Sequence, residues 1–205
     1  MLTKTQLREL YRQPSERSQQ KQISELEEQS KLFISNSPFM LVSTYGNDGR
    51  CDCSPRGGEA GFVRVLNGSQ IAIPDFLGNN RLDSLENIIE TQQIGCLFLI
   101  PGISETLRLN GTASVCNDPE IIEQFSVPDR VKTYILIDIT EVYIHCGKSL
   151  IRSAIWDSST QTNPKEFPSL GKFLNAHVGK TVMTESHSEI DVLYQQTMIE
   201  QDSTE

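Results

Sequence analysis

The sequence has no long apolar run and no excess of basic residues. No apolar stretch approaches the roughly 20 residues that a membrane-spanning helix needs. Lysine and arginine total 18 against 27 aspartate and glutamate residues, which gives a formal net charge of −9. No basic run and no alternation of basic with aromatic residues compensates for this acidity. These absences argue against a membrane protein and against non-specific binding to nucleic acid.

Cysteine and histidine are also scarce. The five cysteines form an odd, scattered set, namely Cys51, Cys53, Cys96, Cys116 and Cys146. Residues 1–28 are polar and mixed in charge, unlike a signal or transit peptide. An odd number of cysteines without a secretory signal argues against a disulfide framework, so we expect reduced thiols and a cytoplasmic protein.

Neither the cysteines nor the histidines form a recognisable catalytic or metal motif. Cys51 and Cys53 would share one face of a strand, but zinc needs two further ligands. We therefore interpret the cysteines as buried structural thiols and predict no metal site. There is no Gly-x-Ser-x-Gly segment, and no spacing ties a carboxylate to His145, His177 or His187. Hydrolase chemistry is disfavoured, although a triad assembled in space stays open.

The residues that are present predict one domain with helical additions at both ends. Thr3–Tyr11 and Glu16–Ser35 are typical of helices, separated by Gln13-Pro14-Ser15, so residues 1–36 are expected to pack outside the core. In the second helix the apolar stripe would consist of Ile23, Leu26, Leu32 and Phe33. Residues 146–205 are expected to be helical again, with helices from His145 to Trp156, over Leu170–His177 and over Glu189–Ile199.

Residues 37–145 have the pattern of a β-rich core. The turn residues Gly46-Asn47-Asp48-Gly49 and Asn67-Gly68 favour hairpins because Asn and Gly accept positive φ. The predicted strands are Phe39–Tyr45, Arg50–Ser54, Val63–Leu66, Gln70–Ile73, Ile94–Ile100, Leu107–Val115 and Lys132–Tyr143. A helix is expected over Arg81–Glu90 and a short one from Asp118-Pro119 to Phe125. Strands joined mostly by hairpins favour an antiparallel barrel over a doubly wound sheet, hence an α+β, mainly β fold.

The segment Asn79-Asn80-Arg81 is a candidate phosphate site. It stands between the apolar run Ile71-Ala72-Ile73 and the start of a predicted helix. Amide groups at a helix start favour an anion, and a guanidinium can add a bidentate contact. The same residues are also ordinary turn and cap residues, so the segment alone does not decide between the two interpretations.

Other arginines fall at strand ends or turns. Arg56 stands in the loop Ser54-Pro55-Arg56-Gly57-Gly58, and Thr106 and Arg108 would share one face of a strand. Lys148, Arg152 and Trp156 recur at helical spacing, which indicates either a cation–π stripe or the edge of a ligand site. Each also has a plain interpretation as a solvated side chain. A small barrel has little interior space, so a ligand would lie outside it, with a second subunit supplying the other wall.

The order of these segments resembles the flavin-binding family related to pyridoxamine 5′-phosphate oxidase. The resemblance covers about Leu7 to Trp156. It is carried by Ser37-Pro38-Phe39, the Ser54–Gly58 segment, Ile73-Pro74-Asp75, Gly78–Leu85, Leu107–Gly111 and His145–Arg152. The most specific parts are Asp75–Leu85 and His145–Arg152.

The resemblance implies a split β-barrel homodimer with peripheral helices, which binds FMN at the subunit interface. It assigns phosphate and ribityl contacts to Arg56, Asn80 and Arg81, and it runs Pro74 and Asp75 past the polar edge of the flavin. The further residues that it places beside the cofactor are Thr106, Arg108, Lys148 and Arg152. The implied activity is an FMN-dependent oxidoreductase that transfers a hydride between flavin and an unidentified small substrate.

One feature of that family is missing. No Arg-x-His segment occurs near the C-terminus, where the founding oxidase holds its substrate, so oxidation of pyridoxamine phosphate is doubtful while FMN binding is unaffected. The alternatives are a non-catalytic flavin carrier or sensor, and a structural dimer that has lost the cofactor. A haem-handling relative, with His145 and His177 as axial ligands, is disfavoured because neither lies in a recognisable haem-binding pattern.

Overall fold

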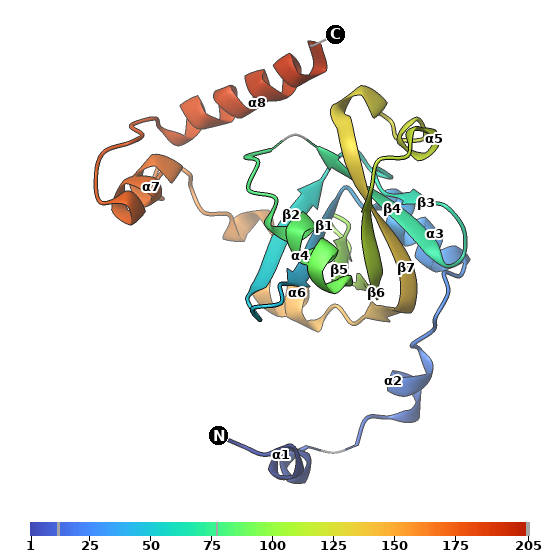
Figure 1. Ribbon diagram of the computed structural model, residues 1–205. Coiled ribbons are helices and arrows are strands. Elements are labelled where there is room, and N and C mark those ends of the chain that lie inside the picture. The colour runs from blue at the N-terminus through green and yellow to red at the C-terminus, as the bar shows by residue number, and fades with distance from the viewer. Residues whose placement is uncertain (12, 77, 204–205) are drawn as a thin grey trace.

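A seven-stranded antiparallel sheet forms the body of the protein (Figure 1). The computed structural model describes residues 1–11, 13–76 and 78–203, with side chains to residue 198. The strands are β1 (Phe39–Tyr45), β2 (Cys51–Gly57), β3 (Arg64–Val65), β4 (Gln70–Phe76), β5 (Gln93–Leu99), β6 (Thr106–Cys116) and β7 (Val131–His145). All seven strands were predicted, and most differ from the predicted bounds only at their ends.

The sheet curves around a core without closing. Its order is β2-β1-β5-β6-β7-β4-β3, so β2 and β3 are its two edge strands. The fifteen-residue β7 pairs with β6 along its length and with β4 over its first half. The predicted α+β, mainly β fold, an antiparallel split barrel with peripheral helices, is confirmed.

Strict alternation of side chains builds the main core. In β1, Met40, Val42 and Thr44 are buried. Ser43 and Tyr45, which alternate with them, face outward. The buried side chains of five strands meet the inner faces of two helices, α3 (Glu28–Asn36) and α4 (Asp83–Thr91), through Ile34 and Ile88. Alternation works here because successive residues of a strand point to opposite faces.

The strand β4 is buried on both faces. Ile71 and Ile73 belong to the main core, while Ala72 packs in a second, smaller cluster with Phe125 and Tyr134. Ile121 and Ile122 of α5 (Pro119–Ile122) pack against that second cluster, and the turn η1 (Pro128–Arg130) leads into its member Val131. A strand with apolar partners on both sides shows no alternation, and this explains the unbroken apolar run at Ile71-Ala72-Ile73.

A β-bulge between Asn110 and Gly111 lets β6 follow the bend of β7. A Cβ atom added at Gly111 would lie 2.3 Å from the carbonyl oxygen of Asp138 on β7. Only glycine allows this approach of two backbones, so the bend of the long strand pair depends on this position.

The N-terminal helices differ from the prediction. The expected helix over Glu16–Ser35 is two helices, α2 (Glu16–Gln20) and α3, joined by an extended segment. Within that segment Ile23 exchanges backbone hydrogen bonds with Val142 at 3.1 and 2.8 Å, so a bridge to β7 replaces helix. The predicted apolar stripe is therefore only partly right: Leu26 is buried in the main core and Phe33 packs against it, whereas Leu32 is 63% exposed. The fully buried side chain of α3 is Ile34, which was not predicted.

The terminal segments extend from the body (Figure 1). The first helix, α1 (Lys4–Leu10), has no buried residue. After α6 (Lys148–Ser153) and η2 (Ser158–Thr160), the chain runs to α7 (Leu170–Val178) and α8 (His187–Ser203). α8 contacts η1, and Ile190 is buried. None of the helices in the described part of the chain has the length and apolar character needed to span a bilayer.

Candidate functional site

A pocket of about 570 Å³ lies where the end of β2, the end of β4 and the start of α4 meet. It brings together four of the predicted site residues, Arg56, Asp75, Asn80 and Arg81. These residues come from three separate parts of the chain. They meet because β4 pairs with β7 while α4, which follows β4, packs on β1 and β2.

The backbone on the α4 side of the pocket has an unusual shape. Asn80 and Leu82 have left-handed φ angles of 58° and 60°, and they flank Arg81. The amide of Arg81 donates to Asn79 Oδ1 at 3.0 Å, which fixes the turn. Leu82 is the N-cap of α4 and provides no side-chain cap. Alternating backbone handedness followed by an uncapped helix start gathers N–H groups into an anion-binding concavity.

Arg81 stands at the mouth of this pocket. Its Nε atom lies 2.8 Å from Asp83 Oδ2, and the Arg81 side chain is 73% exposed. The Asp83 carboxylate raises the pKa of Arg81, first through this hydrogen bond and then through its charge. The guanidinium is thus held by a solvent-exposed pair that costs little to break.

Arg56 and Asp75 face each other deeper in the pocket. Their side chains are 23% and 22% exposed, and Arg56 Nη2 lies 4.0 Å from Asp75 Oδ1, too far for a hydrogen bond. Burial raises the pKa of Asp75, and the attraction of Arg56 only partly opposes this rise. The Nε atom of Arg56 is buried without a hydrogen-bond partner among the described residues. A buried donor without a partner is costly, and it points to an acceptor that belongs here.

A polar network under α4, which sequence reasoning missed, supports the pocket floor. The hydroxyl of the buried Ser84 donates to Asp52 Oδ2 and lies 3.1 Å from Ser54 Oγ. Ser54 Oγ also donates to Asp52 Oδ2, at 2.9 Å. Asp52, Ser54 and Arg56 alternate along β2 and so share one face. That alternation was the available signal, but the partner on α4 could not be read from it.

Thr106 and Arg108 line a second pocket, of about 410 Å³, on the other face of the sheet. Cys53 of β2 and Leu41 of β1 also border this second pocket. Ser54 and Arg56 of β2 instead face the first pocket. Thr106 is buried and Arg108 is exposed. Within one chain, then, the predicted site residues fall on two faces.

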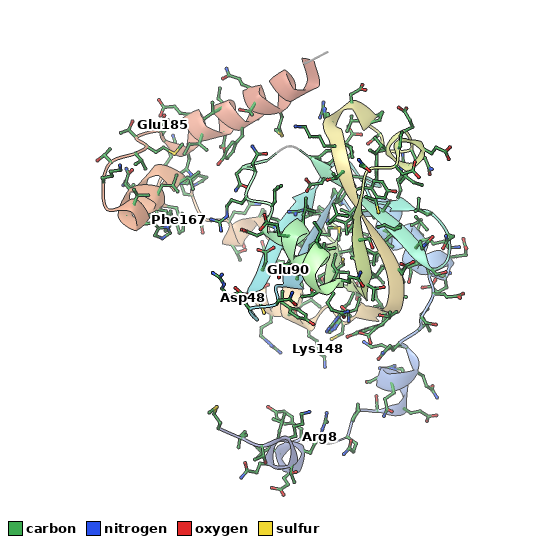
Figure 2. The ribbon with its side chains drawn as sticks, in the orientation of Figure 1. Arg8, Asp48, Glu90, Lys148, Phe167 and Glu185 are labelled. Atoms are coloured by element: carbon green, nitrogen blue, oxygen red, sulfur yellow. The ribbon has the colours of Figure 1, made fainter. Side chains whose placement is uncertain are left out.

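The remaining predicted residues lie outside both pockets. Pro74 is buried within β4. Lys148 and Arg152 are exposed on α6, and Figure 2 shows Lys148 pointing away from the body. The predicted stripe with Trp156 is wrong, because α6 ends at Ser153 and the Trp156 Nε1–H donates to the carbonyl of Ile103 at 2.9 Å.

The cysteines are less buried than predicted. Cys51, Cys53 and Cys146 are exposed, and only Cys96 is fully buried, which raises the pKa of its thiol to about 12. No group of three or more His, Cys, Asp or Glu side chains is arranged to hold a metal ion within the described ranges. Of the two histidines considered as axial ligands, His145 borders the second pocket and His177 is exposed on α7.

Comparison with known proteins gives a match to one family. The family model described as Pyridoxamine 5′-phosphate oxidase matches residues 26–146, which include the whole sheet. No significant match to a curated protein was found.

Several solved structures are similar. HupZ of Group A Streptococcus is 15% identical, with a TM-score of 0.47 over 58% of this chain and 93% of that one. An FMN-binding protein from Syntrophomonas wolfei is 11% identical, with a TM-score of 0.43 over 57% and 82%. A Clostridium acetobutylicum protein related to general stress protein 26 is 16% identical, with a TM-score of 0.41 over 57% and 87%.

Proposed function

The chain belongs to the pyridoxamine 5′-phosphate oxidase family, and on this basis we propose that it is an FMN-dependent oxidoreductase that works as a homodimer. The observation that carries the proposal is the first pocket, in which two arginines and an uncapped helix start converge. A cytoplasmic location is part of the same proposal, since the five cysteines are unpaired thiols.

The pocket suits a phosphate monoester. The amide groups that follow Asn80 and the start of α4 provide donors, and Arg81 needs only to leave its exposed pair with Asp83 to reach a bound phosphate. Arg56 offers a buried Nε–H that has no acceptor within the described part of the chain. The residues present therefore fit the phosphate and ribityl end of FMN.

Asp75 occupies the side of the pocket toward β7. Because burial raises the pKa of its carboxyl, Asp75 takes up a proton more readily than an exposed aspartate would. This makes it suited to hydrogen bonding with the polar edge of a flavin ring, while Arg56 limits the build-up of negative charge. Flavin supplies the hydride chemistry when it is bound, and the protein supplies binding, orientation and charge.

The other wall of the site is proposed to come from a second copy of the chain. On the opposite face of the sheet, Leu41, Leu97 and Leu99 are half-buried apolar side chains around the second pocket. An apolar patch bordered by polar residues is typical of a protein–protein interface. Pairing through this face would bring Thr106 and Arg108 of the partner subunit toward the first pocket.

Titration of the purified protein with FMN tests the proposal. We expect saturable quenching of flavin fluorescence, and we expect Arg81→Ala to raise the Kd by roughly 10- to 150-fold, as the loss of about 1.5–3 kcal/mol from one charge-assisted contact implies. Arg50→Ala is the matched control, because Arg50 also pairs with an aspartate, Asp48, at an exposed turn. Equal affinity in both variants would remove Arg81 from the site.

Turnover is tested separately. The FMN-loaded protein is mixed with NADH or NADPH under anaerobic conditions, and bleaching of the flavin spectrum followed by reoxidation with an added acceptor supports an oxidoreductase. A protein that binds FMN with high affinity but resists reduction by either donor is instead a flavin carrier or sensor.

A further inference from the structure

Two cations pack against one aromatic ring on the outer face of the sheet. The Lys21 Nζ atom lies 4.9 Å from the centre of the Tyr143 ring, and the Arg108 Cζ atom lies 5.7 Å from it. Arg108 is directly opposite Tyr143 in the β6–β7 ladder. Lys21 is held in place because its ammonium group donates to the carbonyl of Ile144 at 2.8 Å. The ring fixes both charges through cation–π contact.

These two charges are not neutralised by a partner. Within the described ranges, neither Lys21 nor Arg108 forms an ion pair. The neighbouring carboxylate on this face, Glu141, accepts hydrogen bonds from the amides of Asn110 and Gln22, one on each oxygen. On a chain with a net charge of −9, two cations that form no ion pair within the described residues make a local positive site.

The same cluster continues into the second pocket. The rings of Tyr143 and His145 lie 5.3 Å apart, and His145 is opposite Thr106 in the ladder. Burial first, and then the charges of Lys21 and Arg108, lower the pKa of His145, which favours its neutral imidazole. Arg108, Thr106 and His145 all border the pocket, with Ser149 adding a hydroxyl. A positive edge formed by Arg108 is thus combined with the hydrogen-bonding groups of Thr106, His145 and Ser149.

We propose that Lys21, Arg108 and His145 form the substrate-recognition site of this protein, and that they bind the oxyanion, a carboxylate or phosphate, of a small substrate. The assignment of the ligand as substrate rests on the proposed flavin function, whereas the anion site itself does not. The cofactor phosphate has its own cradle on the other face of β2, at Arg56 and Arg81. Two separated positive sites therefore suit two anionic groups.

The test uses inorganic phosphate, and separately acetate, as probes of the full-length protein. The chain has only three histidines, so the imidazole NMR signals can be assigned with a His145→Gln variant. We expect phosphate to raise the pKa of His145 in a saturable manner, because an anion beside the ring favours the imidazolium. Arg108→Gln and Lys21→Gln should each weaken phosphate binding at least tenfold. Arg8→Gln, which removes the same charge from the distant helix α1 (Figure 2), should not. A larger response to acetate would indicate a carboxylate substrate.

Repeating the titration with FMN-saturated protein separates the two sites. Retention of the phosphate response supports a substrate site, while its loss on FMN loading would assign the cluster to the cofactor and overturn the proposal. The absence of a saturable change at His145, or equal phosphate affinity in Arg108→Gln and Arg8→Gln, would overturn it as well. A phosphate response in a protein that does not bind FMN would contradict the flavin function and leave the anion site standing.

Discussion

Arg81 and Asp83 form an ion pair across the first turn of α4, with Nε and Oδ2 2.8 Å apart, at the opening of the first pocket. Asp83 therefore binds the same guanidinium group that the proposed phosphate would bind. Both side chains are well exposed, so solvent screening leaves the pair only a small contribution to stability. It keeps Arg81 close to the pocket but also competes with the ligand.

Removing that competitor should strengthen FMN binding. Asp83→Asn releases Arg81 and deletes a negative charge beside the phosphate, so we expect the Kd to fall by roughly two- to fivefold, in line with the small energy of an exposed pair. Asp48→Asn, which breaks the equivalent exposed pair with Arg50, is the control and should leave FMN affinity unchanged. Weaker binding in Asp83→Asn would show that the carboxylate positions Arg81 rather than competing for it.

Stability should depend on pH through Asp75. Its pKa is raised in the folded protein, so its favourable contribution is complete below the unfolded value of about 3.9 and is lost as the pH rises through the folded value. The free energy of unfolding of the wild type, relative to Asp75→Asn, should therefore decline from pH 4 to pH 7 in urea titrations.

Asp48→Asn provides a control of opposite sign for this experiment. Hydrogen bonds from Arg50 lower the pKa of Asp48, so its contribution is present at neutral pH and is lost on acidification. The difference between wild type and Asp48→Asn should thus grow as the pH rises. Parallel curves for both variants would contradict the assignment of the Asp75 shift to burial.

Disrupting the apolar outer face should separate the proposed dimer. Leu97→Glu places a charge among Leu41 and Leu99, and we expect sedimentation as a monomer together with at least a tenfold loss of FMN affinity, because the partner's wall of the site would be missing. Leu32→Glu changes an already exposed leucine on α3 and should alter neither property. A monomeric wild type that binds FMN with full affinity would refute the two-subunit site.

The bulge in β6 should tolerate no side chain. Gly111→Ala would force a Cβ atom against the Asp138 carbonyl, so we expect the free energy of unfolding to drop by about 1–3 kcal/mol, as for other overpacked sites. Gly68→Ala is the control, because the nearest atom to its Cβ is 4.0 Å away. Urea denaturation measures both, and a similar small loss in the two variants would show that the strands move apart without cost.

Local patterning predicted the parts of the fold that depend on near neighbours. The strand Phe39–Tyr45 was predicted with its observed bounds because it is a run of apolar and β-branched residues. The turn before Arg50 was predicted because Asn and Gly accept positive φ, and Gly49 indeed has a φ of 79°. The start of α4 and its neighbouring Arg81 were equally visible. The likeness of the ordered segments to one family was also available from the sequence, and the family is confirmed.

The failures lie where a distant partner replaces a local preference. The segment after Gln20 has helical composition, but Ile23 pairs with Val142, and a helix cannot offer its backbone to a strand. The stripe through Trp156 failed because Ala154 takes a left-handed conformation that ends α6. The hydrogen bond from Ser84 to Asp52 could not be predicted, because the two residues lie far apart in the chain and meet only when α4 packs on β2.

The sequence by itself therefore determined the strands, the turns, the family and the presence of arginines at strand ends, since these follow from short-range periodicity and backbone preference. Only the tertiary structure decided that Arg56 and Arg81 share a pocket while Arg108 lies on the opposite face beside Lys21 and Tyr143. The physical reason is that the sheet order, set by pairing between strands far apart in the chain, fixes which faces meet. No local pattern encodes that order.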